Sequence, residues 1–112
     1  MKAEEGFPHV LSDGVVEQFN KDGFVATPEV FSAAELSTLS DAVDEEVSKR
    51  SAHDTRKVDQ KSIYEQSFVQ CMRLWETSSV VRDFVCDGRL AGMAAQLLRV
   101  PSVRLWQDQA LY

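Results

Sequence analysis

The sequence lacks the features that mark several specialised classes of protein. It has no uninterrupted apolar run long enough to span a bilayer, and residues 1–10 do not resemble a signal peptide. It has only two cysteines, Cys71 and Cys86, and no C-x-x-C pair. These absences argue against a membrane protein and against a disulfide-stabilised secreted domain. We therefore expect a cytoplasmic protein in which both thiols are reduced and buried.

Clustered positive charge is also missing. The chain has 12 Lys and Arg residues against 18 Asp and Glu, with a formal net charge of -6 and a pI of about 4.8. The basic residues between Lys49 and Lys61 are interrupted by Asp54 and Asp59, which is typical of a solvated loop. Because nucleic acids and anionic membranes are bound by clustered cations, we expect neither of them as a partner.

Residues for catalysis and metal binding are scarce. His9 and His53 are the only histidines, whereas the facial iron triad needs two imidazoles and a carboxylate. His53 and Asp54 are adjacent, and adjacent side chains of an extended chain point to opposite faces. Glycine-rich phosphate loops and the G-x-S-x-G motif are absent as well. The residues themselves therefore predict no catalytic residue and no metal ligand.

Capping signals predict a mainly helical scaffold over residues 12–101, after a leader at residues 1–11. The first helix is expected to begin at Ser12 or Asp13 and to end at Gly23, followed by a short strand at residues 24–27. Ser32 and Glu35 form a capping box that opens the next helix. Its apolar side would be buried through Leu36, Leu39, Val43 and Val47. Its acidic side would stay in solvent through Asp41, Asp44, Glu45 and Glu46.

Three more helices are expected in the second half of the chain. One covers residues 63–75, one opens at Ser78 or Ser79, and one opens at Asp87 and runs to Leu98. Residues 102–112 then alternate as a strand, with Gln107 and Gln109 on one face and Asp108 on the other. A strand needs a hydrogen-bonded neighbour, and we expect that neighbour downstream. The 112 residues would then be the N-terminal part of one domain.

Three segments resemble the phytanoyl-CoA dioxygenase-like family of iron(II)/2-oxoglutarate oxygenases. They are FNKDGFVATPEVFSAAELSTLSDAVD, DGRLAGMAAQLLRV and VRLWQDQALY, and the resemblance runs from about Val15 to Tyr112. The order of the segments carries the resemblance, since the family's His-X-Asp iron motif is not among these residues. It implies an α+β fold, in which an N-terminal helical layer packs against a double-stranded β-helix of the cupin or jelly-roll kind. Residues 102–112 would be the first barrel strand, and the remainder of the barrel is absent from this sequence.

The resemblance also implies a function. The chain would be the N-terminal fragment of an oxidoreductase, a dioxygenase that hydroxylates a small-molecule or acyl substrate with iron(II) and 2-oxoglutarate as cofactors. Alone it would bind neither cofactor and would be inactive. The resemblance directs Gln109 toward 2-oxoglutarate, although a purely structural pairing of Gln109 with a neighbouring strand is an equal alternative. It also places Gln70 on a helix near the active-site mouth as a substrate-binding candidate.

Other interpretations stay open for the chain and for several of its residues. Arg73 is expected to form an ion pair with Glu76 or Glu65, and Asp108 is expected to be structural rather than catalytic. A stand-alone helical module that binds a partner protein through its apolar stripe is an alternative function, as is a non-catalytic homologue. We further expect the isolated fragment to self-associate, because its terminal strand would expose an unpaired edge.

Overall fold

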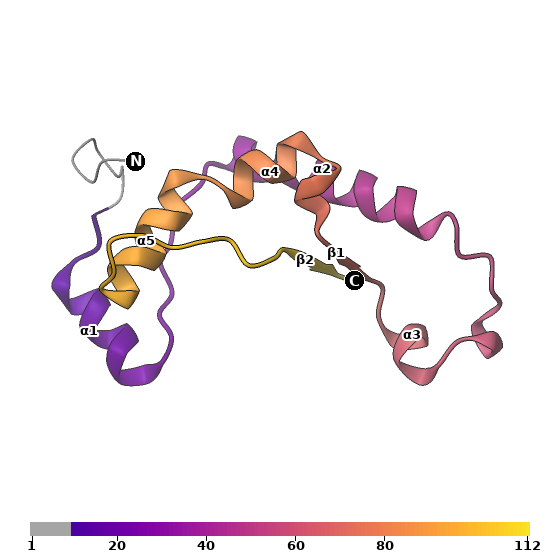
Figure 1. Ribbon diagram of the computed structural model, residues 1–112, viewed down its shortest axis with the longest axis horizontal. Helices are drawn as coiled ribbons and strands as arrows, with labels where there is room; N and C mark the ends of the chain where they lie inside the picture. Colours follow the sequence, from indigo (N-terminus) through magenta and orange to yellow (C-terminus); the bar gives the residue numbers. More distant parts are fainter. Residues whose placement is uncertain (1–9) are drawn as a thin grey trace. The chain divides into compact units, whose positions relative to one another are not determined.

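The computed structural model describes residues 10–112, so most of the predicted leader, including His9, lies outside the described residues. The chain is α+β, combining helices with one small antiparallel sheet (Figure 1). In chain order the elements are α1 (Asp13–Asp22), α2 (Ala33–Ser51), the 3₁₀ helix η1 (Val58–Gln60), α3 (Ile63–Ser67), β1 (Gln70–Met72), the 3₁₀ helix η2 (Leu74–Glu76), α4 (Ser79–Val85), α5 (Gly88–Leu98) and β2 (Gln109–Leu111).

The helix ends confirm the predicted capping signals. The Ser12 hydroxyl accepts a hydrogen bond from the backbone N–H of Val15, and Gly23 ends α1 with a left-handed φ of 82°. Asp87 caps α5 by accepting from the backbone N–H of Arg89 at 2.8 Å. Ser78 accepts from the N–H of Val81 at 3.3 Å, at the start of α4. Helix α2 begins directly after Ser32, as predicted, whereas the capping box itself stays a prediction.

One compact unit contains residues 10–32 and 86–105, with α1 and α5 in contact. The side-chain amide of Asn20 donates to the carbonyl of Leu97 at 3.3 Å, and the backbone N–H of Leu11 donates to the Gln96 side chain at 2.9 Å. The Arg89 guanidinium lies 4.3 Å from the centre of the Phe31 ring. These contacts attach the segments on both sides of α1 to α5.

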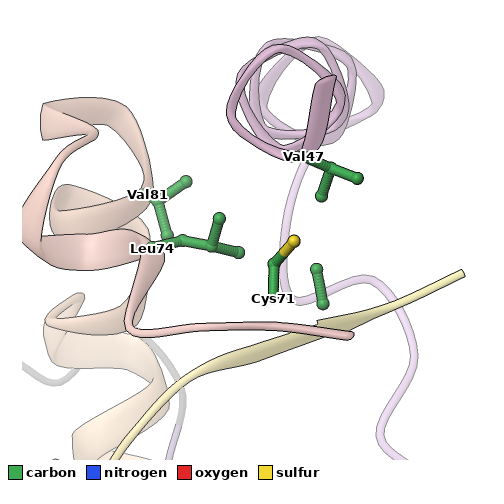
Figure 2. Packing of buried hydrophobic residues seen from close by; sticks show 5 residues of the cluster. Val47, Cys71, Leu74 and Val81 are labelled. Carbon is green, nitrogen blue, oxygen red and sulfur yellow. The ribbon is translucent and has the colours of Figure 1, made fainter. Parts of the chain in front are cut away.

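The second unit contains residues 33–85 and 106–112, and its core lies between α2, α4 and the sheet. Figure 2 shows Cys71 of β1 directed toward Val47 of α2, with Leu74 and Val81 beside them. Ala110 of β2 completes the buried cluster. Cys71 and Ala110 are cross-strand partners, so one face of the sheet is covered by helices.

The terminal strand has its partner upstream, which corrects the prediction of an unpaired strand at residues 102–112. Strand β2 covers only residues 109–111, and it pairs antiparallel with β1 in the register Gln70↔Leu111, Cys71↔Ala110 and Met72↔Gln109. Val69 and Tyr112 exchange two backbone hydrogen bonds, both of 2.9 Å, which extends the ladder by one pair. Figure 1 shows the two strands side by side at the C-terminus.

The predicted helix over residues 63–75 is wrong beyond Ser67. Phe68 has extended backbone angles, φ -137° and ψ 137°, and it ends α3 with a hydrogen bond from its N–H to the carbonyl of Tyr64. The next residues form β1 and η2 because their backbone groups pair with residues 108–112. The apolar spacing suited a helix, but tertiary pairing with a distant segment decided the outcome.

Several smaller predictions also fail. Residues 24–27 form no strand, since nothing in the described chain pairs with them, and Phe24 is 70% exposed. Leu36, expected to be buried, is 47% exposed, and Cys86, also expected to be buried, is exposed. Glu46, expected in solvent, is buried on α2 next to Val47.

Candidate functional site

The sheet places the two predicted site residues on one face. Side chains alternate along each strand, so Cys71 and Ala110 point into the core and their neighbours point the other way. We call this other side the open face of the sheet, and it consists of Gln70, Met72, Gln109 and Leu111. All four residues are exposed. The structure therefore places Gln70 on a strand rather than on the predicted helix, as a diagonal neighbour of Gln109.

A tyrosine orients the amide of Gln70. The hydroxyl of Tyr64 in α3 donates to Oε1 of Gln70 at 3.0 Å, and Nε2 of Gln70 lies 3.8 Å from the sulfur of Met72. The oxygen of this amide is thus engaged, one N–H of its NH₂ group donates to the Met72 sulfur, and the other N–H is the donor that remains for a ligand. The sequence does not indicate Tyr64 as a site residue, because it lies within the helix predicted over residues 63–75. The pair of a tyrosine and a glutamine six residues apart is not recognisable without the bend between them.

Asp108, next to Gln109, has the structural role that was predicted for it. Its carboxylate accepts from the backbone N–H of Leu74 at 2.7 Å and from that of Trp75 at 2.9 Å. These two groups open η2, where unpaired N–H groups need an acceptor. The side chain of Asp108 is therefore used inside the fold and is not offered to a ligand.

The end of β1 is fixed to α2 by a polar network. Arg50 donates to the carbonyls of Met72 and Arg73 and, at 3.0 Å, to the hydroxyl of Thr77. That hydroxyl donates in turn to the buried carboxylate of Glu46 at 2.7 Å. The hydrogen bond from Thr77, helped by the nearby positive charge of Lys49, holds the pKa of Glu46 below its usual value. The positively charged C-terminal end of α2 thus holds the end of β1 in place through hydrogen bonds.

Arg73 closes the strand with a left-handed turn. Its φ of 60° is uncommon for a residue other than glycine, and its side chain forms an ion pair with Glu76. This pair is one of the two predicted alternatives. Glu65, the other candidate, pairs instead with Arg56 at 2.8 Å.

A hollow of about 440 Å³ lies between the loop after α2 and β1. Its polar lining is already paired: Arg56 contacts Asp54 at 2.9 Å as well as Glu65, and Lys61 lies 3.6 Å from Asp54. The hydrogen bonds from Arg56 hold the pKa of Asp54 far below its usual value. The pKa of Glu65 is lowered to about 2, first by the backbone N–H of Ser62 and then by Arg56. The hollow therefore presents no uncompensated cluster of cations to an anionic ligand.

Iron does not fit the residues that the structure describes. Between Val10 and Tyr112 no group of three or more His, Cys, Asp or Glu side chains is placed to hold a metal ion. His53 lies in the exposed turn that follows α2. A carboxylate ligand fits better, because the NH₂ groups of Gln70 and Gln109 are donors on the open face.

No helix within residues 10–112 is both long and apolar enough to cross a bilayer.

Comparison of the chain with known protein families, with curated proteins and with solved structures finds no match. Any function for the open face must therefore follow from its own residues and their geometry.

Proposed function

We propose that this chain is the N-terminal part of an iron(II)/2-oxoglutarate-dependent oxygenase of the phytanoyl-CoA dioxygenase-like family. The order of the three segments that resemble the family supports the proposal. The arrangement of the second unit supports it too, because helices α2 and α4 cover one face of β1 and β2 and leave the other uncovered. In this proposal β1 and β2 belong to the wall of a double-stranded β-helix, and the open face lines its interior.

One observation carries the proposal: Gln70 and Gln109, separated by 39 positions in the chain, lie on the same uncovered sheet face. In the proposed barrel these two amides, which are exposed in this chain, would face the interior, where polar groups need hydrogen-bond partners. 2-Oxoglutarate carries two carboxylates, which accept hydrogen bonds from amide NH₂ groups. We assign Gln109 to 2-oxoglutarate and Gln70, oriented by Tyr64, to the substrate.

The iron ligands are not assigned to any residue of the described chain. Iron(II) together with 2-oxoglutarate and O₂ supplies the oxidising chemistry in this class of enzyme. The residues of this chain would contribute the helical support, part of the barrel wall and the contact from Gln109. In this proposal the substrate is a small molecule or an acyl compound, and the enzyme is cytoplasmic and inactive without its iron ligands.

The coding sequence after the codon for Tyr112 gives the first test. We expect a His-X-Asp motif there, and the full-length gene product should release succinate from 2-oxoglutarate when iron(II) is added anaerobically and O₂ is then admitted. A full-length product that keeps the motif but forms no succinate with any substrate would support the non-catalytic homologue. A stop codon directly after Tyr112 would overturn the oxygenase proposal.

Exposed apolar residues around α3 favour a second candidate, a module that binds a partner protein. Ile63 and Tyr64 are 85% and 53% exposed, and Phe68 and Val69 are 44% and 42% exposed. A group of exposed apolar side chains often marks a protein-binding surface. Replacing Ile63 with Ser should abolish partner binding if this candidate is correct, and it should leave 2-oxoglutarate turnover unchanged if the oxygenase is correct.

A further inference from the structure

The open face of the sheet carries a methionine that solvent reaches. Met72 is 36% exposed, and it also lines the hollow of about 440 Å³ beside β1. Its backbone is fixed at the end of the strand, because its carbonyl accepts a hydrogen bond from the Arg50 guanidinium. Met93, the other methionine among the described residues, is half-buried on α5. A small solute therefore meets the thioether of Met72 more readily than that of Met93.

Two amide side chains flank the sulfur of Met72. Nε2 of Gln70 lies 3.8 Å from the sulfur, and the Tyr64 hydroxyl, bonded at 3.0 Å to the oxygen of the same amide, keeps the NH₂ group turned toward it. Gln109 stands directly opposite Met72 on β2. Hydrogen-bonded and non-hydrogen-bonded pairs alternate along the ladder, and the alternation makes this a non-hydrogen-bonded pair, in which opposing side chains come closest.

We propose that Met72 is a modification site, oxidised by hydrogen peroxide to the sulfoxide, whose oxygen then binds the amides of Gln70 and Gln109. In the reaction the sulfur donates an electron pair to one peroxide oxygen, and an S–O bond forms as the O–O bond breaks. The hydroxide that is released takes the proton from the bound oxygen and becomes water. Sulfur loses two electrons and the peroxide gains them, so no further reactant is needed.

The neighbouring amides distinguish Met72 from an ordinary exposed methionine. A thioether sulfur is a weak hydrogen-bond acceptor, whereas oxidation makes the side chain polar and gives it an oxygen that accepts strongly. Gln70 already directs an N–H at the sulfur, so little ordering is needed when the oxygen is added. Within residues 10–112 the side chain of Gln109 has no hydrogen-bond partner, and its NH₂ group is available. Oxidation of Met72 therefore takes up the amide donors of the open face.

In the proposed oxygenase this modification would be an inhibitory switch. The same two amides are assigned there to 2-oxoglutarate and to the substrate, and the sulfoxide oxygen would compete with both ligands for their N–H groups. This consequence rests on the proposed function. The oxidation and the capture of the amides do not, because they involve only side chains of the open face and a peroxide.

Peroxide treatment of the 112-residue chain, followed by peptide mass mapping, tests the oxidation. We expect Met72 to gain one oxygen several-fold faster than Met93, because the rate of oxidation follows exposure. Met72→Leu is the matched control, since leucine conserves the volume of methionine and cannot be oxidised.

NMR of the side-chain amides tests the capture. In the oxidised wild-type chain the NH₂ protons of Gln70 and Gln109 should shift, and their exchange with solvent should slow by about fivefold, as one added hydrogen bond predicts. The same treatment of Met72→Leu should leave both amides unchanged. Tyr64→Phe should lessen the slowing at Gln70 but not at Gln109, because it releases only the Gln70 oxygen.

A kinetic experiment separates this inference from the proposed function. Peroxide treatment of the full-length protein before iron(II) is added should raise the apparent constant for 2-oxoglutarate in the wild type and not in Met72→Leu. Absence of turnover in both proteins would count against the oxygenase alone, since the amide protons decide the capture independently. Oxidation of Met93 ahead of Met72, or a Met72 sulfoxide that leaves the NH₂ protons of Gln70 and Gln109 unchanged, would overturn the proposal.

Discussion

The carboxylate of Asp108 accepts a hydrogen bond from the backbone N–H of Leu74 at 2.7 Å, across 34 positions of the chain. Leu74 is only 2% exposed and belongs to the core cluster between α2, α4 and the sheet. The same carboxylate binds the N–H of Trp75 at 2.9 Å, so one side chain holds the first turn of η2. This contact joins the segment before β2 to the segment after β1, and it fixes the two strands in register.

Replacing Asp108 with Ala should therefore destabilise the second unit. Two backbone N–H groups would lose a charged acceptor, and hydrogen bonds to charged groups contribute about 1.5–3 kcal/mol each to stability at most sites. We expect the free energy of unfolding in urea to fall by about 3 kcal/mol or more, with an unchanged m-value. Gln107→Ala is the control, since its side chain is exposed, and its effect should stay within about 0.5 kcal/mol. Equal stability of the two variants would contradict a capping role for Asp108.

Local signals in the sequence predicted the helix boundaries well. Ser12, Gly23, Ser78 and Asp87 act through groups within four residues of themselves, so their effect is readable from the sequence alone. The segment after Ser67 was not predictable in this way. Its hydrogen-bond partners are residues 108–112, and a helical pattern of apolar residues carries no information about a partner so far along the chain.

In the candidate site, too, local features were predictable from the sequence, whereas contacts between distant segments were not. Alternation along the terminal strand correctly separated Gln109 from Asp108, because side-chain direction in a strand is a local property. The register that brings Gln70 onto the same face as Gln109 comes from pairing and could not be deduced. Burial of Glu46 was missed for a related reason: its partner, the Thr77 hydroxyl, comes from a turn 31 positions away.

Thr77→Val tests the network around Glu46. Valine keeps the shape of threonine but removes the hydroxyl that donates to the buried carboxylate and accepts from Arg50. A buried charged group that loses a hydrogen bond typically costs about 1–3 kcal/mol, and we expect a loss of that size in urea denaturation. Glu46→Gln combined with Thr77→Val should cost less than the sum of the single changes, because the charge that needs the hydroxyl is gone. Strict additivity would show that the two side chains do not interact.

Glu65 should make the stability of the N-terminal end of α3 depend on acidic pH. Its pKa is lowered from 4.5 to about 2, first by the Ser62 backbone N–H and then by Arg56. A depressed pKa in the folded state means that the contribution to stability is complete above the unfolded value of 4.5 and is lost as the pH falls toward about 2. We expect a carboxyl titration followed by NMR to give this low value in the wild-type chain.

Two variants at Ser62 separate the causes of this shift. Ser62→Ala keeps the backbone N–H and should retain most of the shift, whereas Ser62→Pro removes that N–H and should raise the pKa of Glu65 toward its usual value. The φ of Ser62 is -61°, which proline adopts without strain. An equally low pKa in both variants would assign the shift to Arg56 instead, and Arg56→Ala would then abolish it.

Gln109→Ala should weaken the use of 2-oxoglutarate in the full-length oxygenase more than it weakens iron binding. A hydrogen bond from an amide to a charged acid is worth roughly 1.5–3 kcal/mol, which corresponds to a rise of about tenfold or more in the apparent constant for 2-oxoglutarate. Gln107→Ala is the control, since Gln107 has the same exposed side chain close by in the sequence but lies outside β2. Gln70→Ala should instead raise the KM for the substrate and leave the constant for 2-oxoglutarate unchanged, and Tyr64→Phe should share this effect in weaker form, because it removes the hydroxyl that orients Gln70. If Gln109→Ala keeps wild-type kinetics in steady-state assays while Gln107→Ala does not, the assignment of Gln109 to 2-oxoglutarate is wrong.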